Sequence, residues 1–186
     1  MDEDTELTPE DEDTELAVLR LGHRPGRDER TTTHVGLTAR ALGADRLILA
    51  DAASERRESI DAVTEQFGGP FTVETTDSPN RVLSAWPTVV HLTMYGLPIQ
   101  TVEDDIRASV TDESMLVVVG AEKVPFEVYT HADWNVAVTN QPHSEIASLA
   151  VFLDRLFDGK ELEREWTDAK KRVIPKAEGK QVESTE

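Results

Sequence analysis

Short runs of apolar residues alternate along the chain with longer segments that are apolar on one face only. The short runs predict strands, and the longer segments predict helices. Met115 to Val119, five consecutive apolar residues, has the clearest character of a buried strand. The predicted strands cover residues 16–21, 47–50, 71–74, 88–93, 115–119 and 135–138, and the predicted helices cover 31–42, 54–67, 80–86, 102–110 and 142–157.

Strands that are separated by helices need crossover connections, which are typical of parallel sheets. The pattern therefore predicts an α/β fold with a mostly parallel sheet and helices on both faces. Ligands of such sheets bind at the carboxyl ends of the strands. The loops in which we expect a site are residues 22–30, 95–98, 120–125 and 139–144.

Two of these loops have features that suit a ligand. Gly120 stands where a buried strand ends, so backbone atoms can approach a ligand closely there. Asn140 to Glu145 leads into the last long helix, where Pro142 fits the first turn and free amides are available. Taken alone, the first feature is also compatible with a simple turn, and the second with an ordinary helix cap.

The composition limits the chemistry. The 186 residues favour one domain, and the absence of cysteine excludes disulfides, thiolate zinc sites and a cysteine nucleophile. The apolar runs are far shorter than the about 20 residues of a membrane helix. There is no Gly-x-Gly-x-x-Gly, phosphate loop, His-Glu-x-x-His or Gly-x-Ser-x-Gly motif, and the five histidines lack metal-ligand spacing. We therefore expect no membrane and no metal.

The chain is strongly acidic, with 37 Asp and Glu against 19 Lys and Arg and a net charge of -18. Residues 1–15 hold nine of the acids and no basic residue, so we expect a disordered acidic tail rather than a targeting peptide, and a cytoplasmic protein. Acidity throughout the chain suits a halophile, and it also suits an ordinary acidic protein. Beyond the tail we expect one domain at 16–159 and an extension at 160–186, with a short helix and then a disordered end.

Six arginines lie between Arg20 and Arg46, against three acidic residues. Arginine suits bidentate recognition of phosphate, and local cations would let so acidic a chain bind nucleic acid. The alternative is that Arg27 and Arg30 pair with Asp28 and Glu29 on the surface.

Four segments, Leu19 to Val35, His91 to Gly96, Gly120 to Pro125 and Asn140 to Glu145, resemble the archaeal tRNA cytidine-56 2′-O-methyltransferases of the SPOUT superfamily. The resemblance covers about residues 16–157. It implies a trefoil knot in the carboxyl half, a homodimer, S-adenosylmethionine as methyl donor and tRNA as substrate, whereas periodicity alone favours an unknotted sheet. It places the cofactor pocket at Leu92, Gly120, Ala121, Glu122, Lys123, Val124, Val138, Thr139, Asn140, Gln141, Pro142, His143, Ser144 and Glu145.

Methyl transfer to a ribose hydroxyl needs alignment of three atoms and removal of a proton. Related enzymes use an arginine of the first helix, but here Leu37 stands at the usual spacing and Arg40 lies only three residues before Gly43. We therefore assign the catalytic role to Arg24, and RNA binding to Arg27, Arg30 and His34.

Tyr95 suits either base stacking or packing. The competing functions are a SPOUT methyltransferase that acts on another RNA ribose or base, and an inactive dimer that binds RNA.

Overall fold

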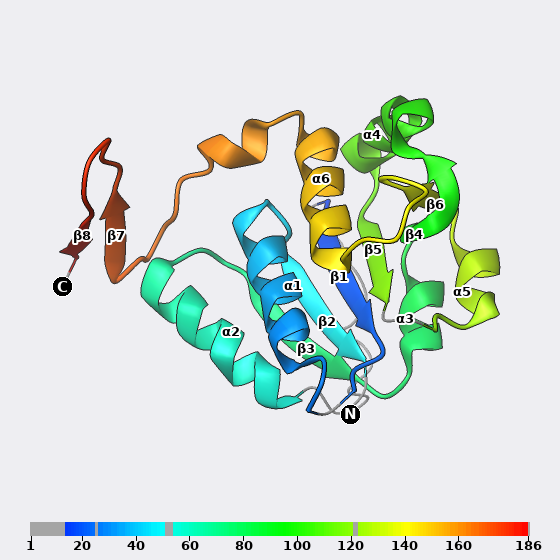
Figure 1. The fold of residues 1–186 in the computed structure, drawn as a ribbon, viewed down its shortest axis with the longest axis horizontal. Coiled ribbons are helices and arrows are strands. Elements are labelled where there is room, and N and C mark those ends of the chain that lie inside the picture. Colours follow the sequence, from blue (N-terminus) through cyan, green and yellow to red (C-terminus); the bar gives the residue numbers. More distant parts are fainter. Residues whose placement is uncertain (1–13, 25, 51–53, 121–122, 186) are drawn as a thin grey trace.

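The computed structural model describes residues 14–24, 26–50, 54–120 and 123–185, and these ranges form one six-stranded sheet and a separate hairpin (Figure 1). The order across the sheet is β3-β2-β1-β5-β4-β6, and all neighbouring strands are parallel. The predicted α/β class is confirmed. The strands are β1 (Leu16–Leu21), β2 (Arg46–Ala50), β3 (Thr72–Thr76), β4 (Thr88–Pro98), β5 (Met115–Gly120) and β6 (Trp134–Ala137).

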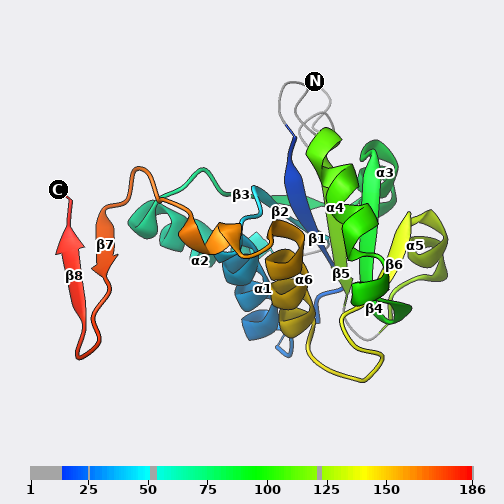
Figure 2. The same cartoon turned by 90° about the horizontal axis from the view of Figure 1, so that it is seen from above.

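Helices cover both faces of the sheet (Figure 2). The buried residues form two clusters, and alternate residues of β5 face each of them: Val117 belongs to one cluster and Val118 to the other. The first cluster contains residues of α1 (Glu29–Ala41), α2 (Ser54–Phe67), α4 (Glu103–Asp112) and α6 (Glu145–Phe157), and the second contains residues of α3 (Pro79–Ala85) and α5 (Phe126–His131). The sheet is therefore the middle of three layers.

The central strands follow directly from their sequences. All six residues of β1 are buried, as are the first five of β5, because a parallel strand in the middle of the sheet is covered on both faces. Arg20 differs from the other residues of β1 because it is charged, and it is nevertheless only 1% exposed. A buried charge needs a partner, and that partner lies at the carboxyl edge of the sheet.

Strand β4 is longer than the sequence predicts. The loop expected at residues 95–98 is instead the end of the strand, which pairs with β6 after a register shift between Leu92 and Leu97. Gly96 makes this possible, because a β-carbon at this position would collide with the backbone of Asn135.

Two helices also differ from the prediction. Helix α6 begins at Glu145 with Ser144 as its N-cap, so Pro142 lies in the preceding loop and not in the first turn. The short helix α5 lies in a segment to which the pattern assigned no element. It begins after Pro125 and has only six residues, too few for a helical period to be visible.

The two ends of the described chain hold more ordered structure than the sequence predicts. Residues 1–13 of the predicted tail lie outside the described residues, but Glu15 belongs to the folded body: its carboxylate accepts a hydrogen bond from Arg46 Nε at 2.6 Å. The short helix expected at about residues 162–173 is wrong: the structure has the 3₁₀ turn η3 (Lys160–Glu163) and then an antiparallel hairpin. Its first strand, β7 (Lys171–Ile174), takes up the end of that range, and its second strand, β8 (Gln181–Ser184), lies in the end expected to be disordered.

Candidate functional site

The sheet order creates a crevice at its carboxyl edge. The chain leaves β1 toward α1 on one face, while it leaves the neighbouring β5 toward α5 on the opposite face. Such a switch point is where open α/β sheets bind ligands. A cavity of about 370 Å³ lies at this edge, lined by residues 91–95 in the middle of β4, by the end of β5, by α5 and by the loop and first turn of α6.

The lining agrees with about half of the predicted cofactor residues. Seven of them line the cavity: Leu92, Gly120, Val124, Gln141, Pro142, His143 and Glu145. Ala121 and Glu122 lie outside the described residues. Lys123, Val138, Thr139, Asn140 and Ser144 are not part of the lining, whereas six residues absent from the predicted set are: His91, Thr93, Met94, Tyr95, Tyr129 and Ser148.

Asn140 and Ser144 shape the loop instead. The amide of Asn140 donates to the carbonyl oxygens of Met94 at 2.7 Å and Gly96 at 3.0 Å, which ties the loop before α6 to the end of β4. Ser144 Oγ accepts a hydrogen bond from the amide of Ala147 at 3.2 Å and so caps α6. Both residues fix the backbone from which Gln141, Pro142 and His143 line the cavity.

His91 is a buried residue of the cavity lining. Its ring is 1% exposed, its Nδ1 lies 2.9 Å from Asn135 Oδ1, and it meets the Tyr129 ring edge-on with a centroid distance of 4.6 Å. Burial lowers the pKa of His91 below its usual value, which favours the neutral imidazole at neutral pH. His91, which has no metal-ligand spacing to another histidine, therefore packs with Tyr129 on one side of the cavity. The periodicity of the sequence does not predict this contact.

Gly120 lines the cavity at a position where there is little room for a side chain. A β-carbon at this position would collide with the Val124 side chain, and both residues face the cavity. The space taken by any larger residue at this strand end would therefore come from the cavity or from Val124.

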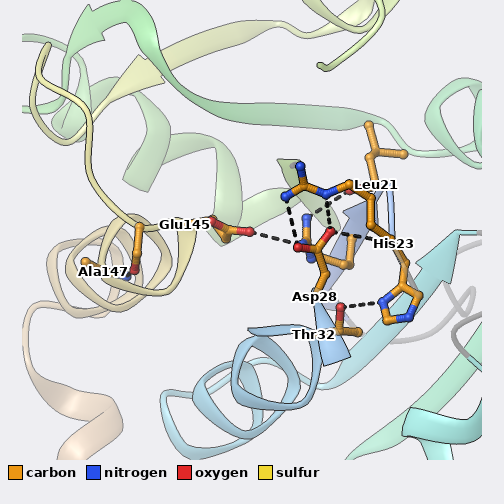
Figure 3. Close-up of polar contacts among 9 residues, drawn as sticks. Leu21, His23, Asp28, Thr32, Glu145 and Ala147 are labelled. Atoms are coloured by element: carbon orange, nitrogen blue, oxygen red, sulfur yellow. Dashed lines mark hydrogen bonds and ion pairs between the residues drawn. The ribbon is translucent and has the colours of Figure 1, made fainter. Parts of the chain in front are cut away.

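The arginine loop (residues 22–30) brings Arg24 close to a carboxylate. Arg24 Nε and Nη2 lie 2.8 and 3.0 Å from the two oxygens of Asp28, and the Arg24 amide donates to the same carboxylate at 3.0 Å (Figure 3). These hydrogen bonds from Arg24 lower the pKa of Asp28 to about 2. The Arg24 side chain is 41% exposed, so its guanidinium is held in one orientation yet remains accessible.

Arg20 links this loop to the cavity. Its Nη1 donates to the Leu21 carbonyl at 2.9 Å, and its Nη2 forms an ion pair of 2.9 Å with Glu145, which lines the cavity (Figure 3). Burial lowers the pKa of Arg20, although an arginine stays charged. The carboxylate of Asp28 also acts electrostatically on Arg20. The arginine loop and the start of α6 therefore share one charge network.

The six arginines of the cationic segment do not form a single patch. Arg40 is buried, donates to the Gly68 carbonyl and stacks over Trp166, while buried Arg46 pairs with Glu15 and Glu74. Helix α1 carries Arg40 to the amino edge of the sheet, away from the cavity. Arg40 is therefore a structural residue.

Arg27, Arg30 and His34 remain exposed beside the site. Arg30 and His34 lie one turn apart on the exposed face of α1. The structure does not contain the alternative surface pairing: among the described residues Arg27 and Arg30 make no ion pair. Asp28 is bound to Arg24, and Glu29 accepts a hydrogen bond from the Gly26 amide. Tyr95 is 76% exposed in this chain and lines the cavity, so it is not packed in the core.

A larger cavity of about 450 Å³ lies at the opposite, amino edge of the sheet. Its lining has two basic residues, Lys160 and Arg164, and four acidic residues: Glu15, Asp45, Glu161 and Glu163. This excess of carboxylates disfavours phosphate and other anions. Across the described ranges, no group of three or more His, Asp and Glu residues is placed to hold a metal ion, and no helix is long and apolar enough to cross a membrane.

Solved structures place the fold. The chain superimposes with a TM-score of 0.58 on the SpoU methyltransferase AviRb from Streptomyces viridochromogenes, at 16% identity, over 83% of this chain and 61% of that one. It superimposes with a TM-score of 0.56 on the TrmH/SpoU tRNA modifying enzyme of A. aeolicus, at 16% identity, over 84% and 80% of the two chains. The fold is that of the SpoU and TrmH methyltransferases.

Sequence comparison is more specific. The profile of a family described as "tRNA ribose 2′-O-methyltransferase, aTrm56" matches residues 67–183. Proteins named tRNA (cytidine(56)-2′-O)-methyltransferase are 63% identical in Haloarcula marismortui, over 90% of this chain and 94% of that protein, and 53% identical in Thermococcus kodakarensis, over 90% and 96%. The chain belongs to this family of tRNA ribose 2′-O-methyltransferases.

Proposed function

We propose that the protein transfers the methyl group of S-adenosylmethionine to the 2′-hydroxyl of cytidine 56 in the T-loop of tRNA. The observation that carries the proposal is the position of Arg24, in a chain whose relatives are named tRNA (cytidine(56)-2′-O)-methyltransferase. Arg24 is held by Asp28 next to a charge network that ends at the cavity lining. An anion-binding group that is linked to a ligand cavity through such a network suits methyl transfer to RNA.

The cavity suits the cofactor. Its volume of about 370 Å³ falls in the range of about 300–1,000 Å³ typical of small-molecule sites. Leu92, Val124 and Tyr129 offer apolar contacts for an adenosine, and Glu145 offers a carboxylate for a cationic group. When bound, the cofactor supplies an electrophilic methyl group. The SpoU methyltransferase from Streptomyces viridochromogenes was crystallised with the same cofactor.

The residues of this chain align the acceptor. Asp28 grips the guanidinium of Arg24 through two nitrogens and fixes its plane, so the arginine meets a phosphate or the reacting hydroxyl without loss of rotamer freedom at that moment. A guanidinium that donates a hydrogen bond to the reacting hydroxyl oxygen stabilises the charge that develops there, and the proton of the hydroxyl passes to a phosphate oxygen of the RNA. The exposed residues Arg27, Arg30 and His34 bind the flanking phosphates in this proposal, and Tyr95 stacks on a base.

The architecture belongs to the same proposal. We assign residues 16–159 to the catalytic domain and 160–186 to an extension. We expect the loop before α6, which Asn140 fastens to Met94 and Gly96, to complete a knot. We expect the exposed residues Leu97 and Phe126 to contact a second copy of the chain in a homodimer. A cytoplasmic location follows from the tRNA substrate. Light scattering measures the dimer directly, and a monomeric mass would contradict it.

The test is mass spectrometry of nuclease-digested tRNA after incubation with isotopically labelled donor. An unmodified transcript should gain one methyl on the ribose of cytidine 56, and a transcript synthesised with 2′-O-methylcytidine at position 56 should gain none. The Arg24→Ala variant is the matched protein control. Label at another nucleotide, or on a base, would assign a different RNA target, and no label at all would indicate an inactive RNA-binding protein.

A further inference from the structure

The carboxyl-terminal hairpin (residues 170–184) carries a second concentration of positive charge. Counted over 160–186 as a whole, seven basic residues balance seven acidic ones, which conceals it. Between Lys170 and Lys180, however, there are five basic residues and one acidic residue, Glu178, and four of the six lysines of the chain lie in this stretch. In a protein with a net charge of -18, this local excess requires an explanation.

Folding of the domain does not explain it. The residues of β7 and β8 are exposed or half-buried, and none belongs to either core cluster. Val173 and Val182 pair across the two strands yet are 59% and 54% exposed. A two-stranded hairpin without a buried face adds little stability to a domain.

The base of the hairpin is nevertheless firmly attached. The Gly69 amide donates to the Thr167 carbonyl at 2.9 Å, and Lys170 and Lys171 reach Glu65 and Gln66 at the end of α2 at 2.5 and 3.3 Å. The ring of Trp166 lies under the Arg40 guanidinium, 4.4 Å from its centroid. The hairpin is thus held in a fixed position beyond α2, at one end of the molecule (Figure 2).

The remaining cations project from this attachment. Arg172, Lys176 and Lys180 are exposed, and within the ranges that the structure describes none of them makes an ion pair. The cross-strand neighbour of Arg172 is Glu183, but the two side chains form no ion pair. Three unpaired cations on a fixed, exposed support are suited to an extended polyanion.

The position of the hairpin fits a long ligand. The arginine loop lies at the carboxyl edge of the sheet, where α2 begins, and the hairpin is attached where α2 ends. A helix of 14 residues is about 21 Å long. One nucleotide cannot reach both places, whereas the backbone of one folded RNA can.

We infer that the hairpin, through Arg172, Lys176 and Lys180, is a second tRNA-binding surface that contacts backbone phosphates at a distance from the target nucleotide. This inference rests on the proposed function, from which it takes tRNA as the ligand. Arg172 lies on β7, and Lys176 and Lys180 lie in the connection between β7 and β8. Exposed lysine and arginine side chains bind phosphate without reading bases, so the contact is independent of sequence.

The experiment measures tRNA affinity between 0.2 and 1 M KCl. The test variant replaces Arg172, Lys176 and Lys180 by Gln. A matched control keeps every charge in place (Arg172→Lys, Lys176→Arg, Lys180→Arg), and a second control removes three charges elsewhere (Arg81→Gln, Arg107→Gln, Arg155→Gln on α3, α4 and α6). Circular dichroism at each salt concentration verifies folding, and donor affinity is measured in every variant.

Each phosphate contact contributes about 0.7–0.9 to the slope of log affinity against log salt. The test variant should therefore lose about 2–3 from the slope, and its Kd for tRNA should rise about 50-fold at 0.2 M KCl and converge with the wild type near 1 M. Both controls should bind as the wild type does, and donor affinity should not change.

Three results would overturn the inference: an unchanged Kd and slope in the test variant, an equal loss in the distant control, or a fall in molecular mass by light scattering, which would assign the hairpin to contacts between protein copies. The proposed function fails separately, when the wild type leaves cytidine 56 unmethylated. Because the hairpin is tested by binding, the two failures are distinguishable.

Discussion

The pair formed by Arg24 and Asp28 allows a quantitative test of the site. Its strength can be worked out from the pKa of Asp28, which the hydrogen bonds from Arg24 lower from 3.8 to about 2. Such a shift corresponds to about 2 kcal/mol, since one pKa unit is about 1.4 kcal/mol. Because the Arg24 side chain is 41% exposed, solvent screening reduces the coupling between the two residues to about 1 kcal/mol.

A double-mutant cycle measures this coupling. Arg24→Ala, Asp28→Asn and the double variant are compared with the wild type by denaturant unfolding, and the interaction energy should be about 1 kcal/mol. Its pH dependence has a defined sign. A carboxyl with a lowered pKa contributes its stability above about pH 4 and loses it as the pH falls toward 2, so the coupling should be constant at pH 5–8 and disappear between about pH 4 and pH 2.

The same variants separate orientation from chemistry. Arg24→Ala should abolish methyl transfer, whereas Asp28→Asn, which keeps the guanidinium and removes the carboxylate that orients it, should lower the single-turnover rate about 10- to 100-fold at saturating tRNA. Donor affinity should stay unchanged in both. Arg24→Lys should not restore activity, because an ammonium lacks the two-nitrogen grip on Asp28. Full activity of Arg24→Ala would refute the catalytic assignment.

Three further predictions concern the cavity, the surface and the charge. Gly120→Ala should weaken donor binding at least about 10-fold by calorimetry, and adding Val124→Ala should restore it, because the collision is with that side chain; unchanged affinity would remove this loop from the pocket. Arg27→Ala and Arg30→Ala should each weaken tRNA binding by about 1–3 kcal/mol, a defect that higher tRNA concentration rescues. The melting temperature should rise between 0.1 and 2 M KCl as salt screens the net charge of -18, with little effect of deleting residues 1–13; an indifferent melting temperature would argue against self-repulsion.

The sequence predicts the parts of the fold that local patterns determine. Strands β1 and β5 are continuous apolar runs, and α6 shows a clear apolar stripe, so their positions follow from periodicity. The distal part of β4 does not, because Tyr95 and Leu97 are exposed and Pro98 ends the segment. Its strand character depends on pairing with β6, which is far away in sequence.

The hairpin was hidden for a related reason. Its strands have no buried face, so neither the apolar alternation nor the burial that identifies a strand is present. The available signals were local: Val173, Ile174 and Val182 on either side of Gly179, which adopts a φ of 79° in the turn. Its excess of positive charge appears only when residues 170–180 are counted separately from the rest of the extension.

In the site, the residue types indicate a function, but the burial of each residue determines which of them are available for it. Six arginines in one segment indicate anion recognition, but Arg20, Arg40 and Arg46 are buried and serve the protein itself. Among them Arg20 has a role that no motif assigns, because it joins the arginine loop to Glu145 at the cavity. A charge removed from water persists only with a partner, so the loss of either Arg20 or Glu145 leaves the other uncompensated. The arginine loop and the cavity lining are therefore held in one arrangement, as a reaction that needs acceptor and donor in line requires.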